Sequence, residues 1–297
     1  MRLTLLGTGC PQCDTERYGP ASLVTCEGRT FLVDCGSGVT QRLVGAGAPG
    51  RDLEAVFLTH LHSDHLVDLY QLVISSWHQG RMRPQRIFGP AGTRRFVEAT
   101  MAAWRDELAL RIGYERRPSA EGLRLEIVEF GGPGVVYDEG RLRVEAVEVD
   151  HRPVRPAFGF VFRFGRRTLA FSGDTRLCPA LVAAARGADV LVHEVFLHRE
   201  MEAAVPAGRM TPEGLRNVAA YHTLSSEVGR VAAEARVRCL VLNHVVPVRF
   251  DRDALLAEVR RDYGGPVVIG EDLMSLDLTT GALAYRGAVV GLDALKP

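Results

Sequence analysis

The sequence predicts an α/β fold in which two β-sheets are packed between layers of helices. Short apolar, β-branched runs alternate along the chain with amphipathic stretches, several of which open with Ser, Thr, Asp or an early Pro. Gly-rich turns separate these runs, and no long polar tract interrupts them. With 297 residues, of which 46% are hydrophobic and 24% charged, the chain can bury a substantial core.

The predicted strands are short apolar runs bounded by turns, a pattern typical of buried strands. The first lie at Leu3–Leu6, Ser22–Cys26, Phe31–Asp34 and Ala55–Thr59. The later ones lie at Leu142–Val149, Gly159–Phe164, Thr168–Phe171, Val190–His193, Cys239–Leu242, Val267–Ile269 and Leu273–Leu278.

The predicted helices lie between these runs, where apolar residues recur with helical spacing. They are Val39–Val44, Leu66–His78, Thr93–Leu108, Pro179–Arg186, Pro212–Tyr221, Ser225–Ala235 and Asp251–Asp262. Between Arg111 and Gly134 the periodicity weakens, but a domain boundary there would separate His60 from His151 in any shared site. We therefore expect a single domain over residues 1–297.

Charge and hydropathy limit the classes of partner. The 36 basic residues balance the 36 acidic ones, so no overall positive field draws the protein to nucleic acid or to an anionic membrane. The apolar start, Met1–Gly9, is too short for a signal peptide, and no run is long enough to span a membrane. We expect a cytoplasmic protein without a membrane partner, whose thiols stay reduced.

Cys10 and Cys13 form a CxxC pair that raises the alternative of a structural zinc site. Cys26 and Cys35 follow them, but each ends an apolar run and neither belongs to a second close pair. Buried or loop thiols are the favoured interpretation.

The strongest chemical signal is the segment Thr59–His65, which reads Thr-His-Leu-His-Ser-Asp-His and follows a predicted strand. Extended backbone sends alternate side chains to one side, so His60 and His62 can bind one metal ion. A turn at Ser63 would aim Asp64 and His65 at a second ion. Histidines that only pack in a core are usually solitary, so the cluster predicts a metal centre.

Three more candidate ligands follow strand-like runs elsewhere in the chain. They are His151, Asp174 and His244. Each alone has an ordinary alternative, a loop histidine or a turn-forming aspartate. Because all three follow strand-like runs, we favour a role as metal ligands for the three together.

These motifs together resemble the metallo-β-lactamase superfamily, in the branch that holds ribonuclease Z and its arylsulfatase-like and phosphodiesterase relatives. The resemblance covers nearly the whole chain. It rests on the HxHxDH segment and on Leu6-Gly7-Thr8-Gly9, Val33-Asp34-Cys35-Gly36, Gly89-Pro90-Ala91-Gly92, Ser172-Gly173-Asp174-Thr175 and His193-Glu194.

The resemblance implies an αββα sandwich with two zinc ions, and a homodimer. It implies that one zinc is held by His60, His62 and His151, the other by Asp64, His65 and His244, and that Asp174 bridges them. Such a bridging carboxylate argues against a typical β-lactamase. Manganese or iron would also suit these ligand types.

The same resemblance points to Glu194 and His222 as a proton-transfer pair, and Asp64 is counted with them as a catalytic residue. Two close metals would supply a bridging hydroxide as the nucleophile, and His222, oriented by Glu194, would protonate the leaving group. Arginines beside the predicted ligands are candidates for binding substrate anions. They are Arg152, Arg155, Arg176 and Arg249.

The sequence leaves more than one substrate class open. Ribonuclease Z grips transfer RNA with a long arm between the positions of His151 and Asp174, and here residues 152–173 leave room only for two paired strands with Gly165 at the turn. This favours a small phosphodiester, phosphotriester or aryl sulfate and makes nucleic acid the less favoured partner.

The alternatives are a ribonuclease Z-type transfer RNA 3′-processing endonuclease without the arm, a lactonase or thioesterase, and a non-catalytic metal-stabilised binding protein. The roles of Asp68, which stands where the family commonly has Gly, and of Trp77–Arg86 stay open.

Overall fold

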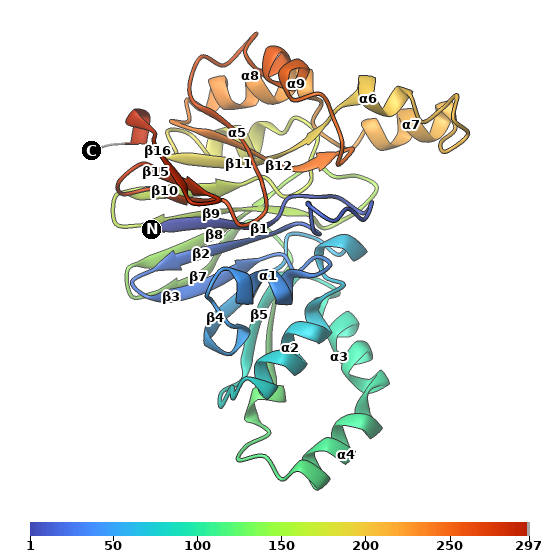
Figure 1. Cartoon of the computed structure of the whole chain (residues 1–297), viewed down its shortest axis with the longest axis vertical. Helices are drawn as coiled ribbons and strands as arrows, with labels where there is room; N and C mark the ends of the chain where they lie inside the picture. Colours follow the sequence, from blue (N-terminus) through green and yellow to red (C-terminus); the bar gives the residue numbers. More distant parts are fainter. Residues whose placement is uncertain (296–297) are drawn as a thin grey trace.

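In the computed structural model, which describes residues 1–295, two β-sheets lie face to face and helices cover their outer sides (Figure 1). One outer layer, at the top of Figure 1, contains α5, α8 and α9, and the other, below the sheets, contains α1, α2 and α3. This is the predicted αββα sandwich. Figure 1 also shows α6 with α7, and α4 beyond α3, projecting from the layers.

The first sheet combines N- and C-terminal strands. Its order in residues 1–295 is β16-β15-β14-β1-β2-β3-β4-β5-β6, with parallel pairing from β3 to β6. Its strands are β1 (Arg2–Gly7), β2 (Ala21–Cys26), β3 (Arg29–Val33), β4 (Leu53–Phe57), β5 (Gln85–Pro90), β6 (Leu125–Phe130), β14 (Ser275–Asp277), β15 (Ala282–Tyr285) and β16 (Ala288–Gly291).

The second sheet contains the middle of the chain. Its order in the same described residues is β13-β12-β11-β10-β9-β8-β7, with β10 to β13 parallel and β7 to β10 antiparallel. Its strands are β7 (Gly134–Glu139), β8 (Leu142–Glu148), β9 (Phe158–Phe164), β10 (Arg167–Phe171), β11 (Val190–Phe196), β12 (Leu240–Val246) and β13 (Val267–Ile269).

The helices are α1 (Val39–Gly45), α2 (Leu69–His78), α3 (Thr93–Ala103), α4 (Arg105–Glu115), α5 (Pro179–Ala184), α6 (His198–Glu202), α7 (Pro212–Ala219), α8 (Ser225–Ala235) and α9 (Arg252–Val259). Short 3-10 turns lie at Gly50–Asp52, Ser63–His65, Glu121–Leu123 and Asp293–Leu295. No helix within residues 1–295 combines the length and the apolar character that crossing a bilayer requires.

The central core lies between the two sheets and draws side chains from both. Phe57 of β4 is fully buried there, with its ring centroid 5.0 Å from Phe88 in its own sheet. Across the interface it lies 5.7 Å from Phe160 and 5.4 Å from Phe162, both edge-on. The two sheets therefore share one core, and a single domain over residues 1–297 stays a prediction.

Truncating Phe57 should therefore weaken the packing of one sheet on the other. We expect Phe57→Ala to lower the free energy of unfolding by about 3–5 kcal/mol, the usual cost of removing a buried phenylalanine. Urea denaturation followed by circular dichroism measures the change. Val289→Ala in β16, where the valine is 68% exposed, is the control and should change stability by less than about 0.5 kcal/mol. Equal losses in both variants would contradict this account of the core.

Several predicted bounds differ from the structure. The predicted helix Thr93–Leu108 is two helices that meet at Trp104, and α2 begins at Leu69 because Ser63–His65 forms a 3-10 turn first. The sequence did not predict β5, β6, β7, β15 and β16. Charged residues interrupt or flank the apolar residues of β5, β6 and β7, whereas β15 and β16 are runs of only four residues that the structure leaves half-buried or exposed.

Candidate metal centre

Strand ends from both sheets bring the candidate ligands to one edge of the sandwich. The chain leaves β4 and carries His60 and His62 before the 3-10 turn Ser63–His65. The second sheet supplies residues that follow β8 and β10, and one from β12 itself. The structure thereby brings together, in two adjoining groups, all seven predicted ligands: His60, His62, His151 and Asp174 in one, and Asp64, His65 and His244 in the other.

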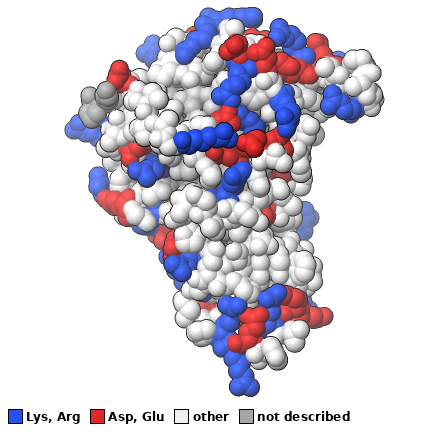
Figure 2. All heavy atoms as spheres, in the orientation of Figure 1, with Lys and Arg blue, Asp and Glu red and all other residues white. Residues whose placement is uncertain are grey.

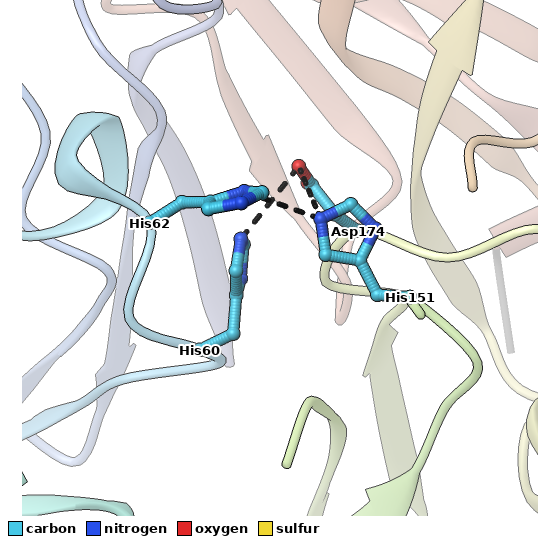
Figure 3. A group of neighbouring side chains, drawn as sticks. All are labelled: His60, His62, His151 and Asp174. Carbon is cyan, nitrogen blue, oxygen red and sulfur yellow. Dashed lines mark hydrogen bonds and ion pairs between the residues drawn. The ribbon is translucent and has the colours of Figure 1, made fainter. Parts of the chain in front are cut away.

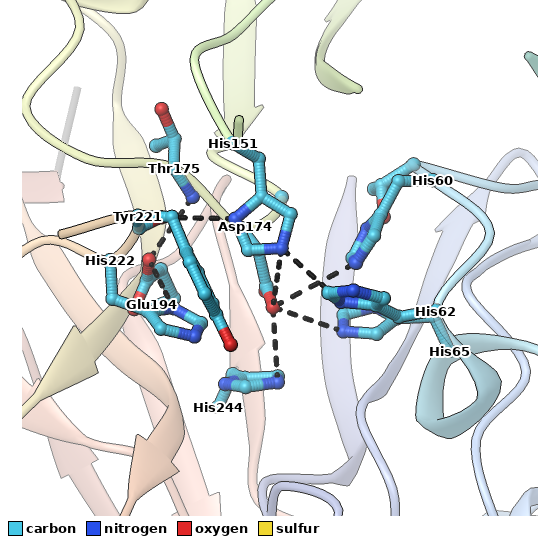
Figure 4. A network of polar contacts seen from close by, with 12 residues as sticks. His60, His62, His65, His151, Asp174, Thr175, Glu194, Tyr221, His222 and His244 are labelled. Atoms are coloured by element: carbon cyan, nitrogen blue, oxygen red, sulfur yellow. Dashed lines mark hydrogen bonds and ion pairs between the residues drawn. The ribbon is translucent and has the colours of Figure 1, made fainter. Parts of the chain in front are cut away.

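The Asp174 carboxylate faces His60 and His151 in the first group (Figure 3) and His65 and His244 in the second (Figure 4). Its Oδ2 atom is 3.9 Å from the Nε2 atoms of both His60 and His151. The same oxygen is 3.4 Å from Nε2 of His65 and of His244 in the other group. A position facing both groups is the one that a bridging carboxylate needs.

The spacing between candidate ligand atoms suits a metal ion. Nε2 of His151 is 3.2 Å from Nδ1 of His62, and Nε2 of His244 is 3.2 Å from Oδ2 of Asp64. Metal–ligand bonds of ~2.0–2.2 Å in a tetrahedral arrangement place neighbouring ligand atoms about 3.3 Å apart. The distances therefore match ligands that share an ion.

Hydrogen bonds on the outer ring nitrogens turn the inner nitrogens toward the centre. His65 Nδ1 lies 2.8 Å from Asp34 Oδ2, and His151 Nδ1 lies 2.9 Å from the carbonyl oxygen of Tyr221. His60 Nδ1 lies 3.0 Å from the Thr59 hydroxyl. Within the described residues, the buried Nε2 atoms of His60 and His65 have no hydrogen-bond partner. Buried nitrogens without a partner are costly unless a metal binds them, so the residues fit a divalent ion.

Burial and neighbouring charges shift the pKa values of the cluster residues in different directions. Burial lowers the pKa of His60 well below its ordinary value and also lowers the pKa of His151. For His65, burial again lowers the pKa, but Asp174 and Asp34 outweigh it and hold the pKa well above its ordinary value. The histidines in turn hold the pKa of Asp174 well below its usual range despite its burial, which opposes this. The site thus holds an ionised carboxylate among imidazoles.

A second polar unit, Glu194 with His222, lies beside the cluster (Figure 4). His222 Nδ1 is 2.9 Å from Glu194 Oε1, which also accepts from the backbone N–H groups of Thr175 and Thr223. Burial lowers the pKa of His222, but Glu194 outweighs it and the pKa rises to about 9. The imidazole stacks on Phe196 at 5.7 Å between ring centroids. Glu194 and Phe196 together therefore fix the orientation of the His222 imidazole.

Sequence comparison agrees with this geometry. Residues 29–245 match the family model of the beta-lactamase superfamily domain. Over 283 residues the chain is 35% identical to a protein named Ribonuclease Z of Mycobacterium marinum, covering 94% of this chain and 99% of the relative. The chain belongs to the ribonuclease Z branch of the metallo-β-lactamase superfamily.

A second relative and two solved structures agree with this assignment and with the fold. A Ribonuclease Z of Mycolicibacterium paratuberculosis is 36% identical over 281 residues, covering 92% of this chain and 96% of the relative. The structure of human tRNase Z, short form, has a TM-score of 0.67 at 23% identity, with 93% and 99% of the two chains covered. YhfI from Bacillus subtilis has a TM-score of 0.69 at 20% identity, with 92% and 98% covered. These structural neighbours establish the metallo-β-lactamase fold.

The four candidate arginines are engaged or lie away from the cavity beside the metal ligands. Arg152 and Arg176 both pair with Asp150. Arg155 lines a separate groove together with Arg152, and Arg249 pairs with Asp14 while 82% of its side chain stays exposed. Adjacency in sequence to a ligand did not bring any of the four into the cavity, because the turn after each strand end carries them outward.

The positions left open by the sequence are also placed. Asp68 accepts hydrogen bonds from the backbone and hydroxyl of Thr40, which ties the start of α2 to α1. Trp77 is buried and donates to the carbonyl of Ser119, and the buried Arg81 donates to backbone carbonyls. Neither metal-ligand group found in residues 1–295 contains a cysteine.

Asp34 is a site residue that our sequence analysis did not assign. It follows β3, is 5% exposed and has a φ of 61°, and it accepts from His65 Nδ1 and from the Thr59 N–H and hydroxyl. Asp34 directly follows a strand, as the ligands do, and this placement could have identified it as a site residue. Asp34 holds two parts of the ligand segment in position.

Neutralising Asp34 should weaken metal binding without removing a ligand. Asn tolerates positive φ, so we expect Asp34→Asn to fold and to bind zinc about tenfold more weakly, the low end of the ~10–100-fold range for partners of ligating histidines. Competition with a chromophoric chelator measures the affinity. Asp52→Asn, at an exposed position in the turn before β4, is the control. Unchanged zinc affinity in Asp34→Asn would remove this positioning role.

Proposed function

We propose that this protein is a zinc-dependent phosphodiesterase of the ribonuclease Z type that cleaves RNA precursors at their 3′ side. The proposed substrate class rests on the similarity of this chain to proteins named Ribonuclease Z, at 34–38% identity along most of both chains. From the sequence alone we expected this activity less than hydrolysis of a small ester, and the similarity to these relatives favours it instead. Zinc suits the ligand types of the cluster.

The roles proposed for the ligands follow the two groups. His60, His62 and His151 would hold one ion, Asp64, His65 and His244 the other, and Asp174 would serve both. Once bound, two such ions would polarise the scissile ester and lower the pKa of the attacking water. Hydrogen bonds on the outer nitrogens of His60, His65 and His151 keep these three imidazoles aimed inward.

Glu194 and His222 are proposed to handle the leaving group. Because Glu194 accepts from His222 Nδ1, the proton that His222 can donate is on Nε2. A pKa of about 9 keeps the imidazole protonated at neutral pH, which a general acid requires. An alkoxide leaving group such as a ribose oxygen depends on this proton more than an aryloxide does.

RNA would have to be held without an arm between His151 and Asp174. β9 and β10 form a tight hairpin, paired from Phe164 and Arg167 onward. On the face shown in Figure 2, basic and acidic side chains are interspersed, and a broad area below the sheets carries few charges. A substrate with few phosphate contacts, such as the end of a short stem, suits such a surface better than a long duplex.

A second candidate is hydrolysis of a small phosphodiester or aryl sulfate. It is favoured by the absence of an arm and by the cavity described below, which is of small-molecule size. The homodimer implied by the family resemblance stays a prediction.

The test is direct comparison of substrates with metal-quantified protein. We expect cleavage of precursor transfer RNA with release of the 3′ trailer, resolved on a sequencing gel, together with weaker turnover of bis(p-nitrophenyl) phosphate. Turnover of bis(p-nitrophenyl) phosphate or p-nitrophenyl sulfate without RNA cleavage would reject the first candidate in favour of the second. An inactive protein that still binds two ions would reject both.

A further inference from the structure

A cavity of about 400 Å³ opens beside the metal ligands and is not explained by metal binding. One side of it consists of site residues, including His62, Asp64, Asp174, His222 and His244. Its volume falls within the ~300–1,000 Å³ typical of small-molecule sites. The cavity therefore has room for a part of the substrate larger than the scissile ester.

Another part of the lining of this cavity is apolar. It is formed by Met201 of α6, Met210, Val218 of α7 and Val246 of β12, which belong to or pack against a hydrophobic cluster centred on Phe196 and Leu215. Apart from the metal-ligand candidates and His222, no charged side chain lines the cavity within the described residues. A substrate group placed here gains from being uncharged.

Tyr221 gives the cavity an aromatic surface next to the reacting centre. Its ring lies 4.9 Å from His151 and 4.8 Å from His222, between ring centroids, and Figure 4 shows it beside both. The side chain is half-buried, and the structure gives its hydroxyl no hydrogen bond to any residue in 1–295. A half-buried ring with a free hydroxyl can both stack on a ligand and donate to it.

We propose that this cavity is a subsite for a flat, uncharged ring that the substrate carries next to its scissile phosphate. The inference rests on the proposed phosphodiesterase activity, since the metal centre would hold the phosphate. Methionine sulfur and tyrosine rings both contact flat rings favourably, and a flat ring offers both of them a larger contact than an aliphatic group does. A nucleobase and a synthetic or metabolic aryl group share this chemistry.

The first measurement is binding, which does not depend on turnover. Adenosine 5′-monophosphate and ribose 5-phosphate offer the same phosphate to the metal centre, and only the first carries a ring. We expect the zinc-loaded protein to bind the nucleotide about tenfold more tightly by calorimetry, the scale of one base stacked on an aromatic side chain. Equal affinities would overturn the subsite.

Matched variants connect this preference to the cavity. Tyr221→Ala keeps the backbone carbonyl that supports His151, and Val218→Asn makes the apolar part of the lining polar. We expect each variant to lose most of the nucleotide preference. Asn217→Ala, at an exposed neighbouring position of α7, should keep it. A preference retained in both cavity variants would place the ring elsewhere and reject the proposal.

A second measurement identifies the source of the ring and separates the inference from the proposed function. The methyl, phenyl and thymidine 5′ diesters of p-nitrophenyl phosphate share one leaving group. If kcat/KM is highest for the thymidine ester, the ring that binds in the cavity is a nucleobase. If it is raised only for the phenyl ester, the ring is an aryl group. Equal values for all three contradict the subsite. Failure to cleave RNA, with the nucleotide preference intact, would instead reject only the ribonuclease assignment.

Discussion

Asp174→Ala is expected to remove at least one of the two metal ions and nearly all activity. The Asp174 Oδ2 atom lies within 3.9 Å of four histidine Nε2 atoms, so its loss leaves buried imidazoles facing each other without the carboxylate that balances them. Transition-state stabilisation by a metal ion is worth several kcal/mol, so kcat/KM should fall by at least about a thousandfold.

Elemental analysis of the purified variant checks this expectation, alongside turnover of bis(p-nitrophenyl) phosphate. Asp262→Ala, at an exposed position after α9, is the control and should keep both ions. Circular dichroism confirms that the variant is folded. Full retention of two ions by Asp174→Ala would overturn the bridging role.

His222→Ala is expected to keep the metal ions and to lose turnover. His222 is bonded to Glu194 and stacked on Phe196, and it lines the cavity without belonging to either ligand group. A positioned general acid contributes about 10²–10⁴-fold, so kcat on an alkyl ester should fall by that amount.

The loss should depend on the leaving group. p-Nitrophenolate leaves without a proton, so esters of p-nitrophenol should lose much less in His222→Ala than esters of an alcohol. Glu194→Gln, which removes the charge that raises the pKa of His222, should show the same dependence in weaker form. Equal losses on both kinds of ester would remove the assignment of His222 as general acid.

Much of the fold was predictable because it depends on local patterns. Apolar runs such as Val267–Ile269 and the amphipathic stretch Ser225–Ala235 have the bounds that periodicity predicted. Strands with few buried residues, such as β6, were missed, and so was β5, which is mostly buried but begins with polar and charged residues. β6 at the sheet edge alternates only between half-buried and exposed positions, and pairing with β5 rather than its own composition makes it a strand.

The candidate ligands were also predictable, since metal chemistry restricts residue types and strand ends restrict their places. The residues that hydrogen-bond to these ligands and position them were not predictable. Asp34 follows a strand, as the ligands do, but its sequence does not show that it contacts His65, and nothing in the immediate sequence of Tyr221 distinguishes it from an ordinary helix-end residue. Arg152, Arg176 and Arg249 show the reverse, because they lie close to ligands in the sequence while their side chains pair with Asp150 or Asp14.

By itself the sequence determined the αββα fold, the superfamily and the seven side chains that could hold metal, because each of these depends on residue type and on spacing along the chain. Only the tertiary structure decided which atoms face one another. The central place of Asp174, the support of His65 by Asp34 and the apolar part of the cavity lining all join residues far apart in the sequence. Such contacts depend on how two sheets pack, and no local pattern records that packing.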